Sequence, residues 1–195
     1  ISSNLRRAVL VFALAVQPVA AQSNWPDKPV KLVVGFTPGS ATDITGRMFA
    51  QKFTEAWGQS VIVDNVAGNS GAIGTDKVAK AAPDGYTLMW AGNAAITILP
   101  SMQQLPYDPL KDFETITTTL VMSSVIFVNN DLPVKSLADL IAHAKANPGK
   151  LSYGSAGHGS LNHLTGELFK LRAGITDLPH VPFKDAVWPK FLREN

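Results

Sequence analysis

Two turns in the sequence combine glycine with side chains that donate or accept hydrogen bonds. The stretch "GFTPGSATD", residues 35–43, holds the first set, which is Thr37, Gly39, Ser40, Thr42 and Asp43. The stretch "SAGHGSLNH", residues 155–163, holds the second set, which is Ser155, Gly157, His158, Gly159, Ser160 and His163. Each turn follows an apolar run and precedes a helical pattern. A helix that begins there presents unpaired backbone N–H groups, which attract carboxylates and phosphates.

The two turns lack the spacings of common catalytic motifs. A phosphate-binding P-loop needs lysine after its last glycine, whereas Ala41 and Thr42 follow in this chain. Neither turn contains a G-x-G-x-x-G fingerprint or a G-x-S-x-G nucleophile elbow. His163 follows Ser160 by one helical turn, which does not place a general base behind a nucleophile. A hydrolase therefore remains only an alternative interpretation.

Two other interpretations compete with ligand binding. His158 and His163 are of a metal-ligating type, but no cysteine and no third nearby ligand supports a site, so neither a metal nor a cofactor is predicted. Thr42 and Ser160 fit simple helix caps about as well as ligand contacts, and Asp43 fits the positive end of a helix dipole. The presence of two hydroxyl-rich turns tilts the interpretation towards binding.

The composition argues against several partners. Among 195 residues, 17 Lys and Arg stand against 15 Asp and Glu, for a net charge of +2. This balance predicts no nucleic-acid binding and no attachment to an anionic membrane surface. The chain has no cysteine, so neither a disulfide nor a lipid anchor on cysteine is expected.

The N-terminal segment has the pattern of an export signal. Arg6 and Arg7 form a short positive region, residues 8–16 are apolar, and small residues up to Ala21 suit cleavage. The apolar run is too short to span a bilayer, so a signal peptide over residues 1–21 is expected rather than a membrane anchor. The mature protein is therefore predicted to be exported.

Hydrophobic periodicity predicts two α/β lobes, residues 22–120 and 121–195, with a ligand cleft between their turns. In the first lobe, strands are expected at 30–34, 60–65 and 86–92, and helices at 41–57 and from the "AGNSGAIG" turn to Ala82. In the second lobe, strands are expected at 124–130, 150–154 and 178–183, and helices at 136–146 and 160–174. Short connections between strands and helices predict parallel sheets. The inward faces are expected to carry Ile44, Met48, Phe49 and Phe53 on one helix, and Leu161, Leu164, Leu168 and Leu171 on another.

Several stretches resemble successive motifs of the Bug receptors, the extracytoplasmic substrate-binding proteins of tripartite tricarboxylate transporters. They are "WPDKPVKLVVGFTPGSATD", "WGQSVIVDNVAGNSGAIG", "AKAAPDGYTL", "LPYDPLKDF", "KLSYGSAGHGSLNHLTGELF" and "HVPFK". The resemblance implies a periplasmic-binding-protein-like fold, with two α/β lobes that close on a small organic acid such as a dicarboxylate, an amino acid or an aromatic acid. It also implies delivery of this ligand to membrane permease subunits, and no enzymatic activity.

The resemblance also implies which residues contact the ligand. Residues 37–43 of the first lobe, and 155–160 with His163 of the second, would hold carboxylate groups, partly through backbone N–H groups and water. Asn93 and Ala94, in the turn after the third strand, would line the pocket. The family usually has glycine at the position of Ser40.

The chain departs from the family after "HVPFK". The family continues with glycine and a helix rich in small residues, whereas this chain reads "DAVWPKFLREN". A C-terminally truncated receptor with an incomplete second lobe is therefore expected. The alternatives are a non-functional remnant of such a receptor and, less favoured, a secreted hydrolase.

Overall fold

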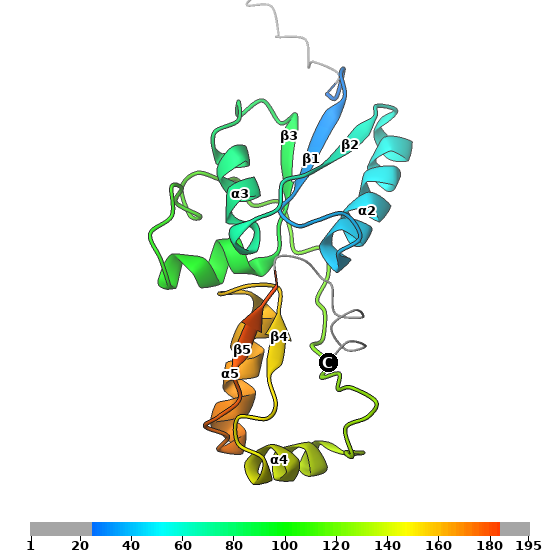
Figure 1. The fold of residues 1–195 in the computed structure, drawn as a ribbon. Coiled ribbons are helices and arrows are strands. Elements are labelled where there is room, and N and C mark those ends of the chain that lie inside the picture. Colours follow the sequence, from blue (N-terminus) through cyan, green and yellow to red (C-terminus); the bar gives the residue numbers. More distant parts are fainter. Residues whose placement is uncertain (1–24, 184–195) are drawn as a thin grey trace, which may run out of the picture.

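A computed structural model describes residues 25–183 of the protein, and the fold is mixed α/β with parallel sheets (Figure 1). The expected signal peptide, residues 1–21, and the "DAVWPKFLREN" segment lie outside the described residues. Within 25–183, no helix has both the length and the apolar character that a membrane crossing needs.

A three-stranded parallel sheet forms the core of the first unit, in the order β2-β1-β3. The strands are β1 (Val30–Val34), β2 (Val61–Asn65) and β3 (Thr87–Trp90). Leu32, Val33 and Val34 in the central strand are at most 2% exposed. Burial on both faces is expected of a strand that helices cover from each side.

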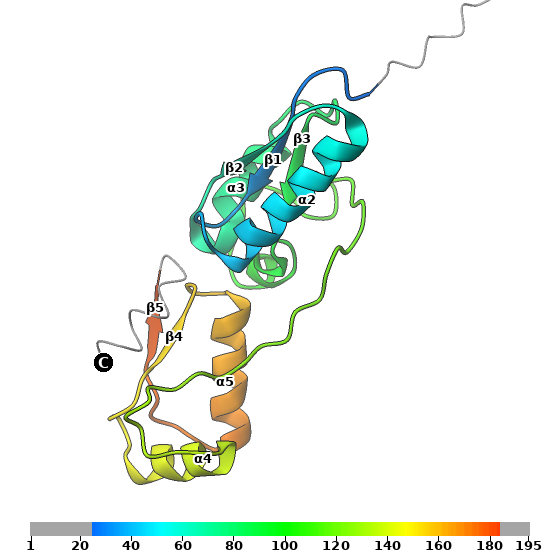
Figure 2. The same cartoon turned by 90° about the vertical axis from the view of Figure 1, so that its right-hand side faces the viewer.

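Helices cover both faces of this sheet. They are α2 (Ala41–Trp57) and α3 (Ala72–Ala79), which lie on opposite sides of the strands (Figures 1 and 2). Helix α2 covers the predicted residues 41–57, begins after Ser40 and ends before Gly58, whose φ of 69° provides a left-handed cap. Helix α3 ends at Ala79, short of the predicted Ala82, because the chain turns before the Pro83-Asp84-Gly85 stop.

Three short helical turns complete the first unit. They are η1 (Asn69–Gly71), η2 (Ala94–Ile98) and η3 (Leu99–Ser101). Ala72, Leu99 and Tyr107 form a second core cluster beside α3. The Tyr107 hydroxyl donates to the Ala95 carbonyl at 2.8 Å, which fixes η2 against this cluster.

The second unit is smaller and also contains a parallel sheet. Its parallel strands are β4 (Tyr153–Ser155) and β5 (His180–Pro182), and its helices are α4 (Leu137–Ala146) and α5 (Leu161–Ala173). Helix α5 lies alongside the strands, and α4 lies at the end away from the first unit (Figures 1 and 2). Helix α4 is capped by Ser136, whose hydroxyl accepts the Asp139 N–H at 3.1 Å. The core of this unit packs Ala144, Ile175 and Leu178.

The carboxyl ends of the two sheets face each other across the junction between the units (Figures 1 and 2). The Ser70 hydroxyl donates to the His158 carbonyl at 2.8 Å and so bridges the units. Gly159 packs on η3, because a methyl group there would lie 2.4 Å from Leu99 Cδ2. The turns that follow the strands are therefore brought to one place, where open α/β sheets bind ligands.

Two predictions for the second lobe were wrong. No strand forms at 124–130, and residues 114–129 contain neither helix nor strand. Val125, Ile126 and Phe127 are 68%, 52% and 73% exposed, since no described strand pairs with this segment. The leucine face of α5 is also exposed instead of inward, at 41%, 38%, 52% and 78% for Leu161, Leu164, Leu168 and Leu171.

The predicted inward face of α2 was partly wrong. Ile44 and Met48 are 53% and 62% exposed, whereas the residues buried against the sheet are Asp43, Gly46 and Ala50. A methyl group on Gly46 would lie 3.2 Å from both Trp90 and Val34. The small side chains in this row let the helix approach the sheet closely. The spacing of the large apolar residues alone therefore predicted the wrong face of α2 as the buried one.

We predict that Gly74→Ala destabilises the fold. Gly74 faces β1 from α3, and a methyl group there would lie 2.8 Å from the Val66 carbonyl oxygen and 3.1 Å from Gly35 Cα. Backbone atoms must move to admit it, so the free energy of unfolding in urea should fall by about 1–3 kcal/mol. Lys77→Ala on the same helix breaks only an exposed ion pair and should lower it by less than about 1 kcal/mol. Equal stability of both variants would contradict this account of the packing.

Candidate functional site

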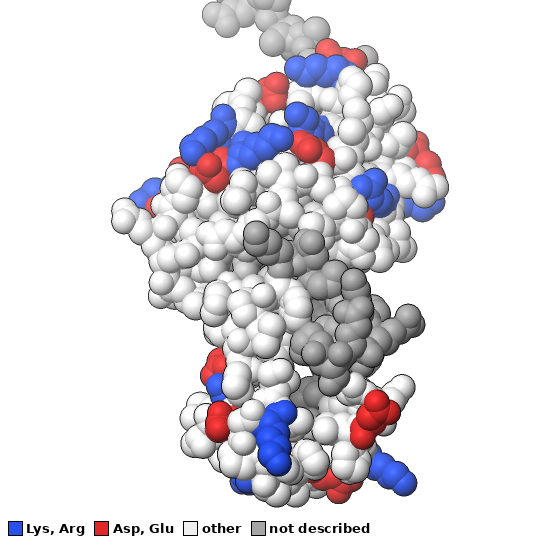
Figure 3. Space-filling view, in the orientation of Figure 1, with Lys and Arg blue, Asp and Glu red and all other residues white. Residues whose placement is uncertain are grey.

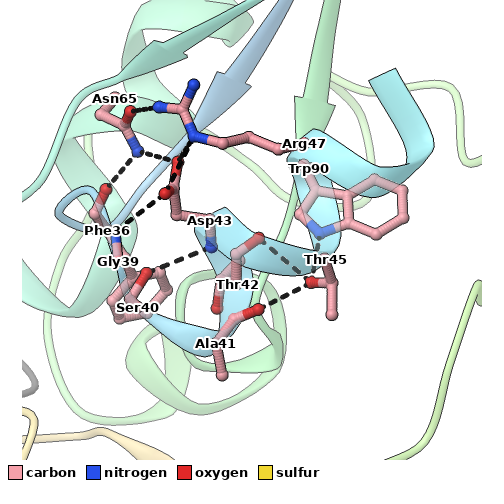
Figure 4. Close-up of polar contacts among 10 residues, drawn as sticks. All are labelled: Phe36, Gly39, Ser40, Ala41, Thr42, Asp43, Thr45, Arg47, Asn65 and Trp90. Carbon is pink, nitrogen blue, oxygen red and sulfur yellow. Dashed lines mark hydrogen bonds and ion pairs between the residues drawn. The ribbon is translucent and has the colours of Figure 1, made fainter. Parts of the chain in front are cut away.

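The first turn is built by a reciprocal pair of hydrogen bonds at the N-terminus of α2 (Figure 4). After β1, Gly39 adopts a φ of 83°, a conformation that suits glycine. The Ser40 hydroxyl then accepts the Asp43 N–H at 3.2 Å, and Asp43 Oδ2 accepts the Gly39 N–H at 2.8 Å. The chain is thereby held in one path from the strand into the helix.

The Asp43 carboxylate is fully engaged within this unit. It is 2% exposed, and Asn65 Nδ2 donates to its Oδ1 at 2.9 Å. Arg47 Nε lies 3.0 Å from the same carboxylate, and Arg47 also donates to Asn65 Oδ1 (Figure 4). Burial raises the pKa of Asp43, but hydrogen bonds from Arg47, Gly39 and Asn65 outweigh it, so the net shift is downward. In this structure Asp43 holds the turn, and its contact with a ligand stays a prediction.

The second turn repeats this geometry at the N-terminus of α5. Ser160 has φ and ψ of −68° and 157°, against −67° and 158° for Ser40. Its hydroxyl accepts the His163 N–H at 3.2 Å, and His163 Nδ1 accepts the Gly159 N–H at 3.2 Å. The two turns thus share the pattern Gly-Ser-x-x followed by a side-chain acceptor. This pattern is readable in the sequence, as "GSATD" and "GSLNH", and would have shown their equivalence.

Each turn keeps backbone donors for a ligand. The first helical hydrogen bonds come from Ile44 and Leu164, so the N–H groups before them have no partner within the helix. In each turn serine caps one of these groups, which leaves those of Ala41 and Thr42 in α2, and of Leu161 and Asn162 in α5. The half-buried Thr42 hydroxyl is also not engaged by any described residue.

The other predicted site residues lie around the same junction. Thr37 is half-buried, and its carbonyl accepts the Ser40 N–H. Asn93 is exposed at the start of η2, while Ala94 behind it is 3% exposed. Gly157 has a φ of 108° and lies against the Ser70 hydroxyl, as a methyl group there would be 3.4 Å from it.

Ser70 is a junction residue that the sequence reasoning missed. It lies in the "AGNSGAIG" turn after β2, with a φ of 49°, and is 7% exposed. Its hydroxyl provides the bridge to His158 described above. A non-glycine residue with positive φ is uncommon and is a reason to look for a local role. Its signal in the sequence was only the glycine on each side of "NS".

Ser155 and His180 form a hydrogen-bonded pair that does not make a nucleophile. Ser155 Oγ lies 2.6 Å from His180 Nε2, but the serine is 0% exposed. Its hydroxyl donates to the Gly157 carbonyl and accepts the Gly157 N–H, so it stabilises the turn. Among the described residues no group orients His180 through Nδ1, which lies buried without a partner. A triad needs both an accessible serine and an oriented base.

Three histidines meet behind the second turn. His163 and His180 stack with ring centroids 4.2 Å apart, and His158 stands nearly perpendicular to both. Burial, and then the neighbouring His163 and His158, lower the pKa of His180 to about 4. Burial and His158 also lower the pKa of His163. The sequence reasoning found no third side chain of this type near His158 and His163, and β5 brings His180 beside them.

Neither the distribution of charged side chains nor the shape of the surface indicates another ligand site among the described residues. In Figure 3, Lys, Arg, Asp and Glu side chains gather over the outer parts of the two units, and the described surface between them is uncharged in this view. A shallow hollow of about 560 Å³ lies along α2 and β2, between Arg47, Gln51 and Val63. Neither turn lines it, so it does not coincide with the junction.

Comparisons with known proteins agree with this architecture. A sequence model of the tripartite tricarboxylate transporter family receptor matches residues 45–187. Protein BugT of Bordetella pertussis is 37% identical over 192 residues, which cover 93% of this chain and 57% of BugT. The match to the family model includes the second turn but begins after the first.

Solved structures give the same assignment. A periplasmic transporter is 39% identical with a TM-score of 0.75, over 83% of this chain and 54% of that one. Rpa4515 of R. palustris with adipate is 37% identical with a TM-score of 0.70, over 87% and 56%. MatC of Rhodopseudomonas palustris with bound malate is 26% identical with a TM-score of 0.66, over 86% and 56%. The chain spans about half the length of these relatives.

The fold is therefore that of the periplasmic solute-binding proteins, as the sequence predicted. More particularly, the chain belongs to the tripartite tricarboxylate transporter receptor family, which confirms the resemblance to the Bug receptors.

We predict that Asp43→Asn lowers the stability of the fold in a pH-dependent way. An amide has one acceptor oxygen, so it cannot serve Gly39 and Arg47 at Oδ2 and also Asn65 at Oδ1, and the free energy of unfolding near neutral pH should fall by about 1–3 kcal/mol. The folded-state pKa of Asp43 is depressed, so its stabilisation is present above the unfolded-state pKa and lost as the pH falls through the folded-state value. The gap between wild type and variant should therefore shrink in acid.

Urea unfolding followed by circular dichroism across the acidic range measures this gap. Exposed Asp131 offers the matched control, because Asp131→Asn removes a carboxylate outside this network. A gap for Asp43→Asn that stays constant from neutral to acidic pH would contradict the assignment.

Proposed function

We propose that this protein is a periplasmic receptor that captures a small organic dicarboxylate and delivers it to the permease of a tripartite tricarboxylate transporter. The observation that carries the proposal is the pair of equivalent helix N-termini at the facing carboxyl ends of two sheets. Family membership and the similar structures with adipate and malate support it. The receptor acts by binding and release and is not an enzyme.

In the proposed complex, each turn holds one carboxylate. The N–H groups of Ala41 and Thr42, with the Thr42 hydroxyl, donate to one end of the ligand, and those of Leu161 and Asn162 donate to the other. The positive ends of both helix dipoles favour the two negative charges. The Asp43 carboxylate does not oppose them strongly, because hydrogen bonds from Arg47, Gly39 and Asn65 compensate its charge.

The remaining predicted residues shape the site. Ser40 and Ser160 accept a backbone N–H and keep their own proton to donate to the ligand or its water. Gly39, Gly157 and Gly159 give the positive φ values that aim the N–H groups. Thr37, Asn93 and Ala94 would line the first lobe, and Ser155 and His163 the second.

The proposed lobes are residues 22–120 and 121–195, which move as a hinge when the ligand binds. The proposed boundary falls within the irregular segment 114–129, where few fixed contacts would resist rotation. Residues 1–21 would serve for export and be removed.

We predict that Thr42→Val weakens binding of adipate or malate. Valine keeps the shape of the side chain and removes its donor, so binding should weaken by on the order of 1–3 kcal/mol, or roughly 5- to 150-fold in Kd. Isothermal titration calorimetry of the full chain with a panel of carboxylic acids provides the measurement. Thr176→Val, at an exposed position after α5 and outside the proposed hinge, is the control and should leave Kd unchanged.

Unchanged affinity of Thr42→Val would remove this residue from the site. Absence of heat with every acid, combined with turnover of an ester substrate, would overturn the receptor in favour of a hydrolase. A cooperative thermal transition in near-ultraviolet circular dichroism shows in the same preparations that the chain is folded, which separates loss of binding from loss of structure.

A further inference from the structure

The three histidines behind the second turn converge from separate segments. His158 belongs to the turn itself, His163 to the first turn of α5, and His180 to β5. One nitrogen from each ring lies within 4.8 Å of the other two. The ring centroids are 4.2 Å, 5.0 Å and 5.4 Å apart. Three imidazoles on one tetrahedral ion, at about 2.0–2.1 Å per bond, would place their centroids roughly 5 Å apart.

The hydrogen bonds of His180 identify the nitrogen that can bind an ion. The Ser155 hydroxyl has a single proton and gives it to the Gly157 carbonyl at 3.0 Å. With the hydroxyl proton so placed, the tautomer of His180 that suits the 2.6 Å contact is the one in which Nε2 donates to Ser155 Oγ. The lone pair is left on Nδ1, which is buried and has no partner among the described residues. A metal-ligating histidine characteristically donates its other N–H to such an orienting group.

The other two rings can complete a ligand set. His163 Nδ1 carries a lone pair, since it accepts the Gly159 N–H in a long bond of 3.2 Å that an ion can replace. The His158 ring is exposed and makes no hydrogen bond within residues 25–183, so its nitrogens are free to turn towards the other two. Nitrogens up to 4.8 Å apart must close to about 3.4 Å around an ion, so the exposed His158 must turn inward and the stacked His163 and His180 rings must tilt towards a common point.

Carboxylates near the rings are already paired. Glu167 accepts from the Tyr153 hydroxyl at 2.6 Å and from Lys170 at 2.9 Å. The ligand set is therefore neutral nitrogen rather than oxygen. Hard cations such as Mg²⁺ and Ca²⁺ prefer oxygen, whereas imidazole suits Zn²⁺, Ni²⁺, Cu²⁺ and Co²⁺.

We propose that His158, His163 and His180 form a binding site for a divalent transition-metal ion, with Ser155 orienting His180 from behind. Three protein ligands leave a fourth coordination position open to water or to a small anion. The site shares Ser155 and His163 with the lining of the proposed carboxylate pocket but does not use its backbone donors, and its test needs no carboxylate.

Metal titration of the full chain tests the site. Tag-free protein freed of metal with a chelator is titrated with ZnCl₂ by calorimetry, and with CoCl₂ by visible absorption, near neutral pH. We expect a single ion per chain and an intense Co²⁺ spectrum of the tetrahedral type. His158→Asn and His180→Asn should each weaken Zn²⁺ binding by at least about 10-fold.

His143 on α4 is the matched control, because it is the one other histidine in the sequence. His143→Asn should bind Zn²⁺ as wild type does. His158 is exposed, so its substitution keeps the fold, and circular dichroism checks this for each variant. Failure of wild type to bind either ion, or equal affinity in His143→Asn and His158→Asn, would overturn the proposal.

Discussion

The shape of the first unit at the junction depends on the burial of one carboxylate. Asp43 sits at the N-terminus of α2, where the helix dipole favours a negative charge, and takes donors from the turn, from α2 and from β2. Asn65 also donates to the Phe36 carbonyl, so the same network fixes where the chain leaves β1. Removal of any donor would leave a buried charge undercompensated, which is costly. The path of the turn and the direction of its remaining N–H groups follow from this constraint.

The second unit uses the same backbone solution with different chemistry. His163 occupies the position in the second turn that Asp43 occupies in the first. Its neutral ring accepts the Gly159 N–H, as the Asp43 carboxylate accepts the Gly39 N–H. A neutral acceptor needs no compensating cation. The His163 ring can therefore stack on His180, whereas the Asp43 carboxylate pairs with Arg47. The same turn geometry therefore provides backbone N–H donors for an anion in both units. In the second unit it also provides ring nitrogens for a cation.

Local signals in the sequence predicted where elements begin and end. Helix α2 spans the predicted residues 41–57, and only its N-terminal cap differs, since Ser40 and not Thr42 accepts the Asp43 N–H. Which face of a helix is buried depends on contacts between residues distant in sequence. The predicted buried faces of the helices were for this reason wrong in part. Ile44 and Met48 have the apolar character of a core face, but the sheet contacts the row that contains Gly46, where Trp90 has room to pack. The apolar run 124–130 failed for a related reason, because a strand exists only when another strand pairs with it.

The candidate site shows the same division between local and distant information. The cap at Ser160 was predicted, because a cap serine bonds only three residues along the chain, whereas α2 is capped by Ser40 and not by the predicted Thr42. His180 was not predicted, because its place depends on the pairing of β4 with β5. In that register His180 lies beside Tyr153, and side chains alternate along a strand, so His180 shares a face with Tyr153 and Ser155. The stacking on Tyr153 and the bond to Ser155 both follow from this single register. A histidine on a short strand thus joins two others only after the sheet has formed.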